Sequence, residues 1–244
     1  MAINFPLLLK VDESAGGRGV YFCVDQNQLK LIIEKLSESK KARLVIQKYI
    51  KGETIAVEAI YKDGTLMGYT YATVVKTLKD EFGISSERHY SVNPDIETSL
   101  AQIGHSFGIN GFATMTFMFE TRTSKHYLVE ADLRPQGWFR LGAFCGVDFS
   151  KVIQNFLDNK NILYRPLLLD GKAYLTMWRC FRDVRRCLQL LDWVGLWRWS
   201  TNADNRWRFI IWYDWKMSLR LLLRAVTWIK YKLQQSLRIG IKEI

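Results

Sequence analysis

The sequence predicts an α+β protein with a separate basic extension, on two observations. Short apolar runs typical of strands follow one another along the first part of the chain, with helical patterns only between groups of them, which favours α+β over regular βαβ winding. Residues 1–171 carry 20 Lys and Arg against 19 Asp and Glu, whereas residues 172–244 carry 15 against 5 and eight of the nine tryptophans. We therefore expect an α+β domain over 1–171 and a mainly helical, basic, Trp-rich C-terminal extension over 172–244.

The first half of the chain predicts several strands and one helix. Strand-like apolar runs stand at 7–11, 20–24, 44–50, 54–61 and 66–75, the last two joined by the turn Lys62-Asp63-Gly64. Asp25 and Gln28 are spaced like a capping box, which predicts a helix start. The helix they open has an apolar stripe at helical spacing, formed by Leu29, Ile32, Ile33 and Leu36.

The second half predicts two more helices around a hairpin. Asp95 is the expected N-cap of a helix with the apolar stripe Ile96, Leu100, Ile103 and Phe107. Residues 111–120 and 126–132 are typical of two strands joined by a polar turn, and Asp148 opens a helix through Leu157. The segment around Ser85, Ser86 and His89 is interpreted as a polar loop at the surface, with a substrate mouth as the alternative.

Composition excludes several classes of protein. The chain has 244 residues, 48% of them hydrophobic, with 16 Gly and 4 Pro, so disorder and collagen-like or low-complexity structure are excluded. No apolar run approaches the ~18 residues of a spanning helix, and the N-terminus does not resemble a signal peptide. The four cysteines and three histidines show neither zinc spacing nor a disulfide framework. We expect a cytoplasmic protein, with peripheral membrane attachment as the alternative.

A glycine-rich loop follows the first strand, at Ser14, Ala15, Gly16, Gly17, Arg18 and Gly19. Such a turn exposes backbone N–H groups and lets the chain approach a polyphosphate closely. No Gly-Lys-Ser/Thr follows, and the next segment is strand-like, so neither a P-loop nor a dinucleotide fingerprint is present. Lys10, on the strand before the loop, is placed to reach phosphate oxygens. The loop is either a flap over phosphates or an ordinary flexible hairpin.

A second candidate site lies on the strand that ends at Pro135. Glu130, Asp132 and Arg134 alternate along it, so an extended strand points all three to one face, with ~6.6 Å between successive members. Two carboxylates on one face suit Mg²⁺, which takes one or two carboxylates together with phosphate oxygens. Their neighbours are largely apolar, which favours a functional face over a merely solvated one.

Three blocks together resemble the ATP-grasp superfamily, in its order and approximate spacing: FPLLLK with the GGRG turn, LVIQKYIKGE, and YLVEADLRP. The similarity covers about residues 5–150 and implies ATP held between two α+β subdomains. Lys10 would contact the α- and β-phosphates beneath the loop of Ser14, Gly16, Gly17, Arg18 and Gly19. Backbone groups of Gln47, Lys48, Tyr49 and Ile50 would meet adenine, and Glu53 the ribose. Glu130 and Asp132 would hold Mg²⁺, with Mn²⁺ as an alternative, and Arg134 would be the catalytic residue near the γ-phosphate or acyl substrate.

The resemblance also implies a reaction, the joining of a small-molecule carboxylate to an amine or thiol through an acylphosphate, with Mg²⁺ and cations stabilising the transferred charge. Three features differ from the usual pattern. Asp132 stands where the family has Asn, Thr116 stands where it has another acidic ligand, and the usual amino-terminal domain is missing. The alternatives are therefore a non-catalytic nucleotide-binding module, a split subunit whose partner supplies that domain, and a peripheral membrane protein.

The basic extension interleaves aromatic and cationic residues, including Trp193, Trp197, Trp215, Lys216, Arg220 and Arg224. The interpretation that the sequence favours is packing of Trp and Leu onto a folded domain, as chain ends often do. Association with an anionic membrane surface is the next alternative. Nucleic acid is a distant third, because no RNA- or DNA-binding motif accompanies the aromatics.

Overall fold

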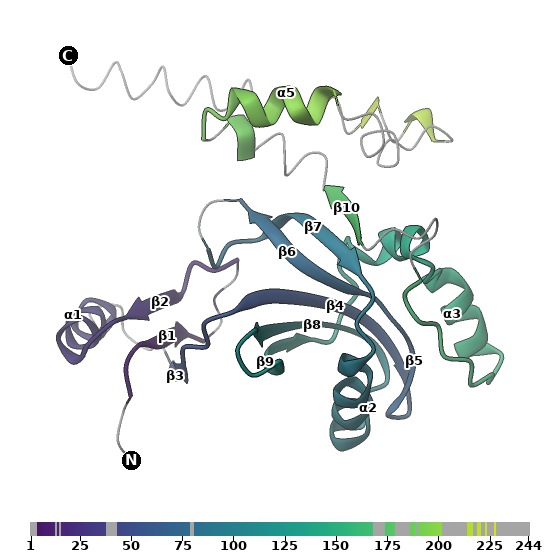
Figure 1. The fold of residues 1–244 in the computed structure, drawn as a ribbon, viewed down its shortest axis with the longest axis horizontal. Coiled ribbons are helices and arrows are strands. Elements are labelled where there is room, and N and C mark those ends of the chain that lie inside the picture. The colour runs from purple at the N-terminus through teal and green to yellow at the C-terminus, as the bar shows by residue number, and fades with distance from the viewer. Residues whose placement is uncertain are drawn as a thin grey trace. The chain divides into compact units, whose positions relative to one another are not determined.

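The structure is a computed structural model of the whole chain, which divides into two compact units, Met1–Leu191 and Asp192–Ile244 (Figure 1). It describes the following residues: 4–12, 14, 16–37, 43–78, 81–167, 174–178, 186–188, 190–201, 214–216, 219–220, 223 and 227. Each unit is described by itself. The first unit contains two antiparallel sheets, one of three strands and one of seven.

The small sheet has the order β2-β1-β3, built from β1 (Leu7–Val11), β2 (Val20–Cys23) and β3 (Leu44–Lys48). Helix α1 (Gln26–Ser37) packs on one face, against a core of Leu7, Leu9, Cys23 and Leu29. The predicted capping box is confirmed. The backbone N–H of Gln28 donates to Asp25 Oδ1 at 2.8 Å, and Gln28 Oε1 in turn accepts from the backbone N–H of Val24 at 2.9 Å.

The large sheet has the order β10-β7-β6-β4-β8-β9, and β5 pairs with β4 outside this path. Its strands are β4 (Glu53–Lys62), β5 (Thr65–Tyr69), β6 (Tyr71–Thr77), β7 (Ser85–Ser91), β8 (Gly111–Glu120), β9 (Lys125–Asp132) and β10 (Tyr174–Trp178). The predicted hairpin of 111–120 and 126–132 is confirmed as β8 and β9. Strand β4 pairs with β8 over nine residues, from Glu53 opposite Phe119 to Tyr61 opposite Gly111.

Two expectations about strands were wrong. The single strand predicted over 66–75 is divided at Thr70, because β5 pairs with the end of β4 and β6 pairs with Ile55 and Ala56 near its start. The backbone N–H of Thr70 donates to the carbonyl of Glu58 at the division. The segment around Ser85, Ser86 and His89 is not a loop. It is strand β7, paired on both sides by β6 and β10.

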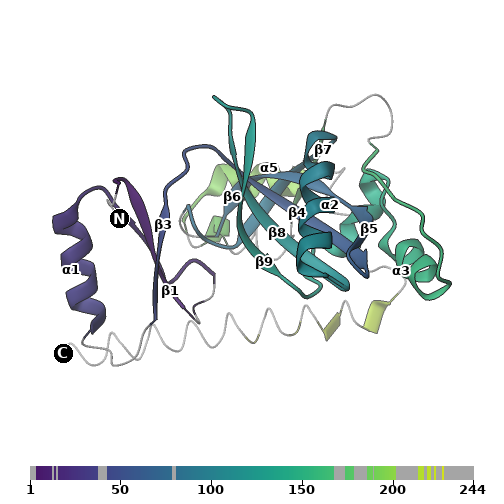
Figure 2. The same cartoon turned by 90° about the horizontal axis from the view of Figure 1, so that it is seen from below.

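The two faces of the large sheet are covered differently. Helix α2 (Asp95–Phe107) lies along one face (Figure 2), where Ile96 and Leu100 pack with Ile55, Val57 and other odd-numbered residues of β4. On the opposite face, Ile60 packs with the 3-10 helix η1 (Phe139–Cys145) and helix α3 (Phe149–Leu157), but only at the far end of β4. The remainder of this second face carries the polar residues Glu58, Thr114 and Thr116 beside Ala56 and Met118, and these polar residues belong to the candidate site.

The helix ends follow the sequence in part. Asp148 caps α3, accepting from the backbone N–H of Ser150 at 3.0 Å, as predicted. Asp95 lies inside α2, whose N-cap residue is Pro94. The last residue of the predicted apolar stripe of α2 is not buried. Phe107 is largely exposed, because α2 ends there and the chain turns at the left-handed Gly108.

The division between the units differs from the boundary that we expected after residue 171. Strand β10 begins at Tyr174 and pairs with β7, so residues just past 171 belong to the large sheet. The second unit begins at Asp192 and contains helix α5 (Trp193–Thr201). In the described part of the chain, every helix is too short or too polar to cross a membrane.

Candidate functional site

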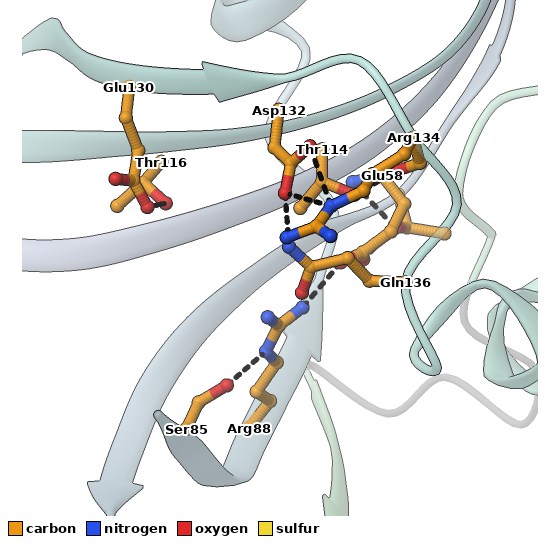
Figure 3. A network of polar contacts seen from close by, with 10 residues as sticks. Glu58, Ser85, Arg88, Thr114, Thr116, Glu130, Asp132, Arg134 and Gln136 are labelled. Atoms are coloured by element: carbon orange, nitrogen blue, oxygen red, sulfur yellow. Dashed lines mark hydrogen bonds and ion pairs between the residues drawn. The ribbon is translucent and has the colours of Figure 1, made fainter. Parts of the chain in front are cut away.

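The two predicted metal-binding carboxylates project from the same face of β9. Glu130 stands opposite Thr116 of β8, and Asp132 stands opposite Thr114. Figure 3 shows both carboxylates pointing to the same side of the sheet. Thr116 Oγ1 donates to Glu130 Oε1 at 3.4 Å. Threonine therefore fills the place opposite Glu130 with a neutral hydrogen-bond donor, where the resemblance would have an acidic ligand.

The strand that carries these carboxylates is less regular and less buried than expected. The pairing register shifts between Thr116 and Phe117, whose partners are Glu130 and Leu128, so Val129 is an extra residue in β9. Strand β9 is also an edge strand, with Leu128 partly exposed. Its apolar composition therefore does not indicate a core position. A functional role of Glu130 and Asp132 is supported instead by the residues that surround them.

Asp132 is held by two neighbours from its own chain segment. Arg134 Nε donates to Asp132 Oδ1 at 2.9 Å and to Oδ2 at 2.7 Å, and Gln136 Nε2 donates to Oδ2 at 3.2 Å. The backbone carbonyl of Arg134 accepts from Thr114 Oγ1. The Arg134 guanidinium is largely exposed despite its ion pair. This arrangement places a cation and a carboxylate side by side, and Arg134 can reach a second anion while it pairs with Asp132.

A buried ion pair on the same face was not predicted. Arg88 of β7 donates from Nη1 to Glu58 Oε1 of β4 at 2.6 Å, and the two side chains are 6% and 0% exposed. Arg88 Nε donates to Ser85 Oγ (Figure 3). Thr70 Oγ1 donates to Glu58 Oε2, and the centre of the Trp138 ring lies 4.3 Å from the guanidinium carbon of Arg88. Glu58 is adjacent in the sheet to Thr114, which faces Asp132.

Lys10 connects the small sheet to these carboxylates. It lies on β1, opposite Val20 of β2 and Val45 of β3. Partial burial lowers the pKa of Lys10, and the negative charge of Glu130 raises it by a smaller amount. The second effect is an electrostatic interaction of Glu130 with Lys10, although the two residues belong to different sheets.

The glycine loop forms the turn between β1 and β2. Gly16 and Gly17 have φ values of +65° and +79°, which other residues rarely adopt. A Cβ added to Gly17 would lie 2.2 Å from the carbonyl oxygen of Phe82, so only glycine fits there. Ser14 Oγ donates to the carbonyl of Val11, Gly19 is buried, and Arg18 is exposed. Ala15 lies outside the described residues.

The predicted adenine segment follows β3. Gln47 stands opposite Leu8 and so shares a face of the small sheet with Lys10, whereas Lys48 belongs to the other face. The Gln47 Oε1 atom is buried without a hydrogen-bond partner in the structure. Tyr49 packs edge-on against Phe22 with ring centroids 4.8 Å apart, and Ile50 is half-buried. A buried carbonyl without a donor fits a ligand that offers an N–H group.

Glu53, the predicted ribose ligand, lies on the opposite face of the large sheet from the carboxylates of β9. It begins β4, and strand alternation places it with Ile55 and Val57 on the face that α2 covers. Its charge acts on Tyr71 of the same side. Thr54, one residue later, shares the face of Glu58. The ribose role of Glu53 stays a prediction.

The donor set for a metal is small. Among the residues that the structure describes, no group of three or more His, Cys, Asp or Glu side chains is arranged to hold a metal ion. Glu130 and Asp132 therefore offer two carboxylates, and the remaining ligands of a cation would be phosphate oxygens and water. This composition fits Mg²⁺ bound with a nucleotide better than a cation held by protein alone.

Comparison with known proteins identifies the fold. Neither a family model nor a curated protein matches the sequence. Among solved structures, the biotin carboxylase domain of Hydrogenobacter thermophilus 2-oxoglutarate carboxylase, in complex with MgADP, ADP and bicarbonate, is 19% identical with a TM-score of 0.53, over 71% of this chain and 41% of that one. Rhizobium etli pyruvate carboxylase is 16% identical with a TM-score of 0.50, and the match covers 64% of this chain and 15% of that one. L-amino acid ligase from Bacillus licheniformis is 17% identical with a TM-score of 0.45, and the match covers 69% of this chain and 41% of that one.

The similarity to the two carboxylases confirms the ATP-grasp fold that the sequence resemblance implied. The chain is an α+β protein with an ATP-grasp-like fold, and it spans less than half the length of the solved chains to which it is similar. At these identities the likeness concerns the fold alone.

Proposed function

We propose that this protein binds ATP and Mg²⁺ between its two sheets and uses them to join a small-molecule carboxylate to an amine. The observation that carries the proposal is the pair of carboxylates, Glu130 and Asp132, on one face of β9 with the Arg134 guanidinium beside them, since two carboxylates and a cation suit a metal–polyphosphate ligand. The unpaired, buried oxygen of Gln47 on the face of Lys10 supports it, because the exocyclic amine of adenine is a hydrogen-bond donor.

In this proposal each residue has a distinct electrostatic task. Lys10 neutralises phosphate oxygens, aided by backbone N–H groups of the glycine loop. Glu130 and Asp132 hold Mg²⁺, which when bound stabilises the charge of the transferred phosphoryl group. Arg134, already paired with Asp132, orients the acyl carboxylate or the γ-phosphate through its exposed guanidinium.

Calorimetric titration of the full chain with ATP, with and without Mg²⁺, tests nucleotide binding. We expect saturable binding that Mg²⁺ strengthens. Lys10→Ala should remove most of the affinity, and Glu130→Gln should remove the Mg²⁺ enhancement while weaker binding of metal-free ATP persists. Glu120→Gln on the same hairpin is the matched control and should behave as the parent protein. A folded chain that does not bind ATP, or a Glu130→Gln variant with full Mg²⁺ enhancement, would refute the site.

A non-catalytic nucleotide-binding module is the second candidate. The neutral Thr116 opposite Glu130 favours it, because it leaves one acidic ligand fewer for a metal ion. Phosphate release separates the two functions. A ligase releases phosphate from ATP only when both a carboxylate and an amine substrate are added, whereas a module binds Mg-ATP and releases none with any pair in a screen of amino acids and small carboxylates.

A further inference from the structure

Helix α5 presents large apolar side chains to solvent. Trp193, Val194 and Trp197 are 63%, 63% and 70% exposed. Positions three and four residues apart are neighbours on a helix, so Trp197 lies beside both Trp193 and Val194 and the three form a single apolar surface. Exposed apolar residues scattered singly are ordinary, but two tryptophans and a valine on one helical face indicate a surface that binds something.

A second set of residues repeats this arrangement with charge beside it. Trp215, Leu219 and Leu223 are helical, stand four residues apart, and are 65%, 48% and 56% exposed. Lys216 and Arg220, each one position further along, are exposed as well. Lys216 Nζ lies 5.8 Å from the centre of the Trp215 ring. Apolar and cationic side chains therefore run next to each other along the same segment.

The charge of this part of the chain selects the kind of partner. Residues 192–244 carry 10 Lys and Arg against 4 Asp and Glu. A second copy of the chain would bring the same positive charge to the contact, which disfavours self-association. Nucleic acid would match the charge, but Val194, Leu219 and Leu223 have no aromatic ring on which a base could stack. A bilayer with anionic headgroups matches both the charge and the aliphatic residues.

We propose that two apolar helical faces of the second unit, one formed by Trp193, Val194 and Trp197 and the other by Trp215, Leu219 and Leu223 with Lys216 and Arg220 beside it, bind the surface of membranes that contain anionic phospholipid. The tryptophans and aliphatic side chains enter the boundary between headgroups and acyl chains, and the cations pair with phosphate and carboxylate headgroups. The protein lies on the bilayer through these faces. They belong to the second unit, whereas Lys10 and Glu130 belong to the first, so we expect attachment to be independent of nucleotide binding.

Flotation of the full chain with lipid vesicles tests the proposal. We expect the protein to float with vesicles of phosphatidylcholine and phosphatidylserine, to remain unbound with phosphatidylcholine alone, and to be released by high salt. Trp193→Ala with Trp197→Ala should weaken vesicle binding at least about tenfold. Lys216→Glu with Arg220→Glu should weaken it at least about 30-fold.

Matched variants control for the substitutions themselves. Phe107→Ala removes a comparably exposed aromatic residue from α2, and Lys30→Glu with Lys151→Glu makes the same charge change on exposed residues of α1 and α3. Both should leave flotation unchanged. Lys10→Ala should abolish ATP binding and leave flotation unchanged, which keeps this proposal distinct from the proposed function.

Four results would overturn the proposal. One is absence of flotation by a chain that circular dichroism shows to be folded. Another is an equal change of vesicle binding in the control variants and in the tail variants, which are the Trp193 with Trp197 and the Lys216 with Arg220 substitutions. The third is tighter binding to single-stranded RNA than to anionic vesicles, with the tail variants losing both, which would assign the two faces to nucleic acid. Tail-dependent dimerisation without lipid binding would assign them to a second copy and would refute the proposal equally.

Discussion

The buried pair of Glu58 and Arg88 is the most costly arrangement of side chains near the site. Both are removed from water, and desolvation of two charges is offset only when the geometry is good and the remaining polar atoms are bonded. Here Thr70 and Ser85 supply those bonds, and Trp138 stacks on the guanidinium. A pair of this kind is weak evidence for stability by itself, but removal of one member leaves the other charge buried and uncompensated.

Glu58→Gln should therefore lower the free energy of unfolding by about 3–5 kcal/mol, and Arg88→Met by a similar amount. The double variant should cost clearly less than the sum of the two, because neither charge is then left alone. Urea denaturation measures all three. Arg122→Ala, at the exposed ion pair with Glu120, is the control and should have almost no effect. Additive losses in the double variant would show that the two side chains do not act as a pair.

Lys10 predicts how ATP affinity depends on pH. Burial lowers its pKa below the ordinary 10.5 in the free protein, and bound phosphates would raise it. Below the free-protein pKa, Lys10 is protonated in both states and affinity is at its full value. As the pH rises through that pKa, binding requires uptake of a proton and affinity falls. Titrations at increasing alkaline pH should show this fall, whereas Lys10→Arg should bind with little pH dependence over the same range. A pH-independent parent protein would contradict the role of Lys10.

Individual site residues differ in how far sequence could predict them. The shared face of Glu130 and Asp132 followed from alternation, because the extra residue, Val129, precedes both. The ion pair of Asp132 with Arg134 was within reach of the same reasoning, since the two are only two residues apart, although β9 ends at Asp132 and Arg134 follows the strand. The pair of Glu58 and Arg88 was not, because its members are 30 residues apart and depend on strand pairing that periodicity does not specify.

Among the strands and helices, sequence predicted an element correctly where residues at its own start indicate where it begins. The capping residues Asp25 and Asp148 correctly located α1 and α3. The division of 66–75 into β5 and β6 escaped prediction because both halves pair with β4, and the hydrophobic pattern does not change at Thr70. Strand β7 escaped because its buried residues include Glu87 and Arg88, which composition assigns to a surface loop.

The turn between β1 and β2 provides a test at the level of one element. Gly17→Ala places a methyl group 2.2 Å from a backbone oxygen and adds the cost of a left-handed alanine, so the loop must move. We expect a loss of most Mg-ATP affinity. Gly108→Ala has a similar positive φ but open space around its Cβ, so it should cost only about 1 kcal/mol of stability and leave affinity unchanged. Calorimetry and urea denaturation measure the two effects. Equal ATP affinity in both variants would mean that the loop does not cover the phosphates.

In the molecule as a whole, the proposed nucleotide site draws its residues from both sheets of the first unit. Lys10, Gln47 and the glycine loop belong to the small sheet, whereas Glu130, Asp132 and Arg134 belong to or follow the edge strand of the large one. A ligand that binds residues of both sheets stabilises only the state in which both are folded and correctly placed. The stability of the whole unit should therefore depend on nucleotide concentration.

Mg-ATP at a hundred times its dissociation constant should raise the free energy of unfolding by about 2.7 kcal/mol. For a unit of this size, that corresponds to an increase of roughly 5–10 °C in the melting temperature. Differential scanning calorimetry of the full chain measures the shift. Under the same conditions Lys10→Ala and Glu130→Gln should each show a much smaller increase, although they change opposite sheets. An increase that survives one of these variants intact would place the nucleotide on the other sheet alone and would contradict a site shared between them.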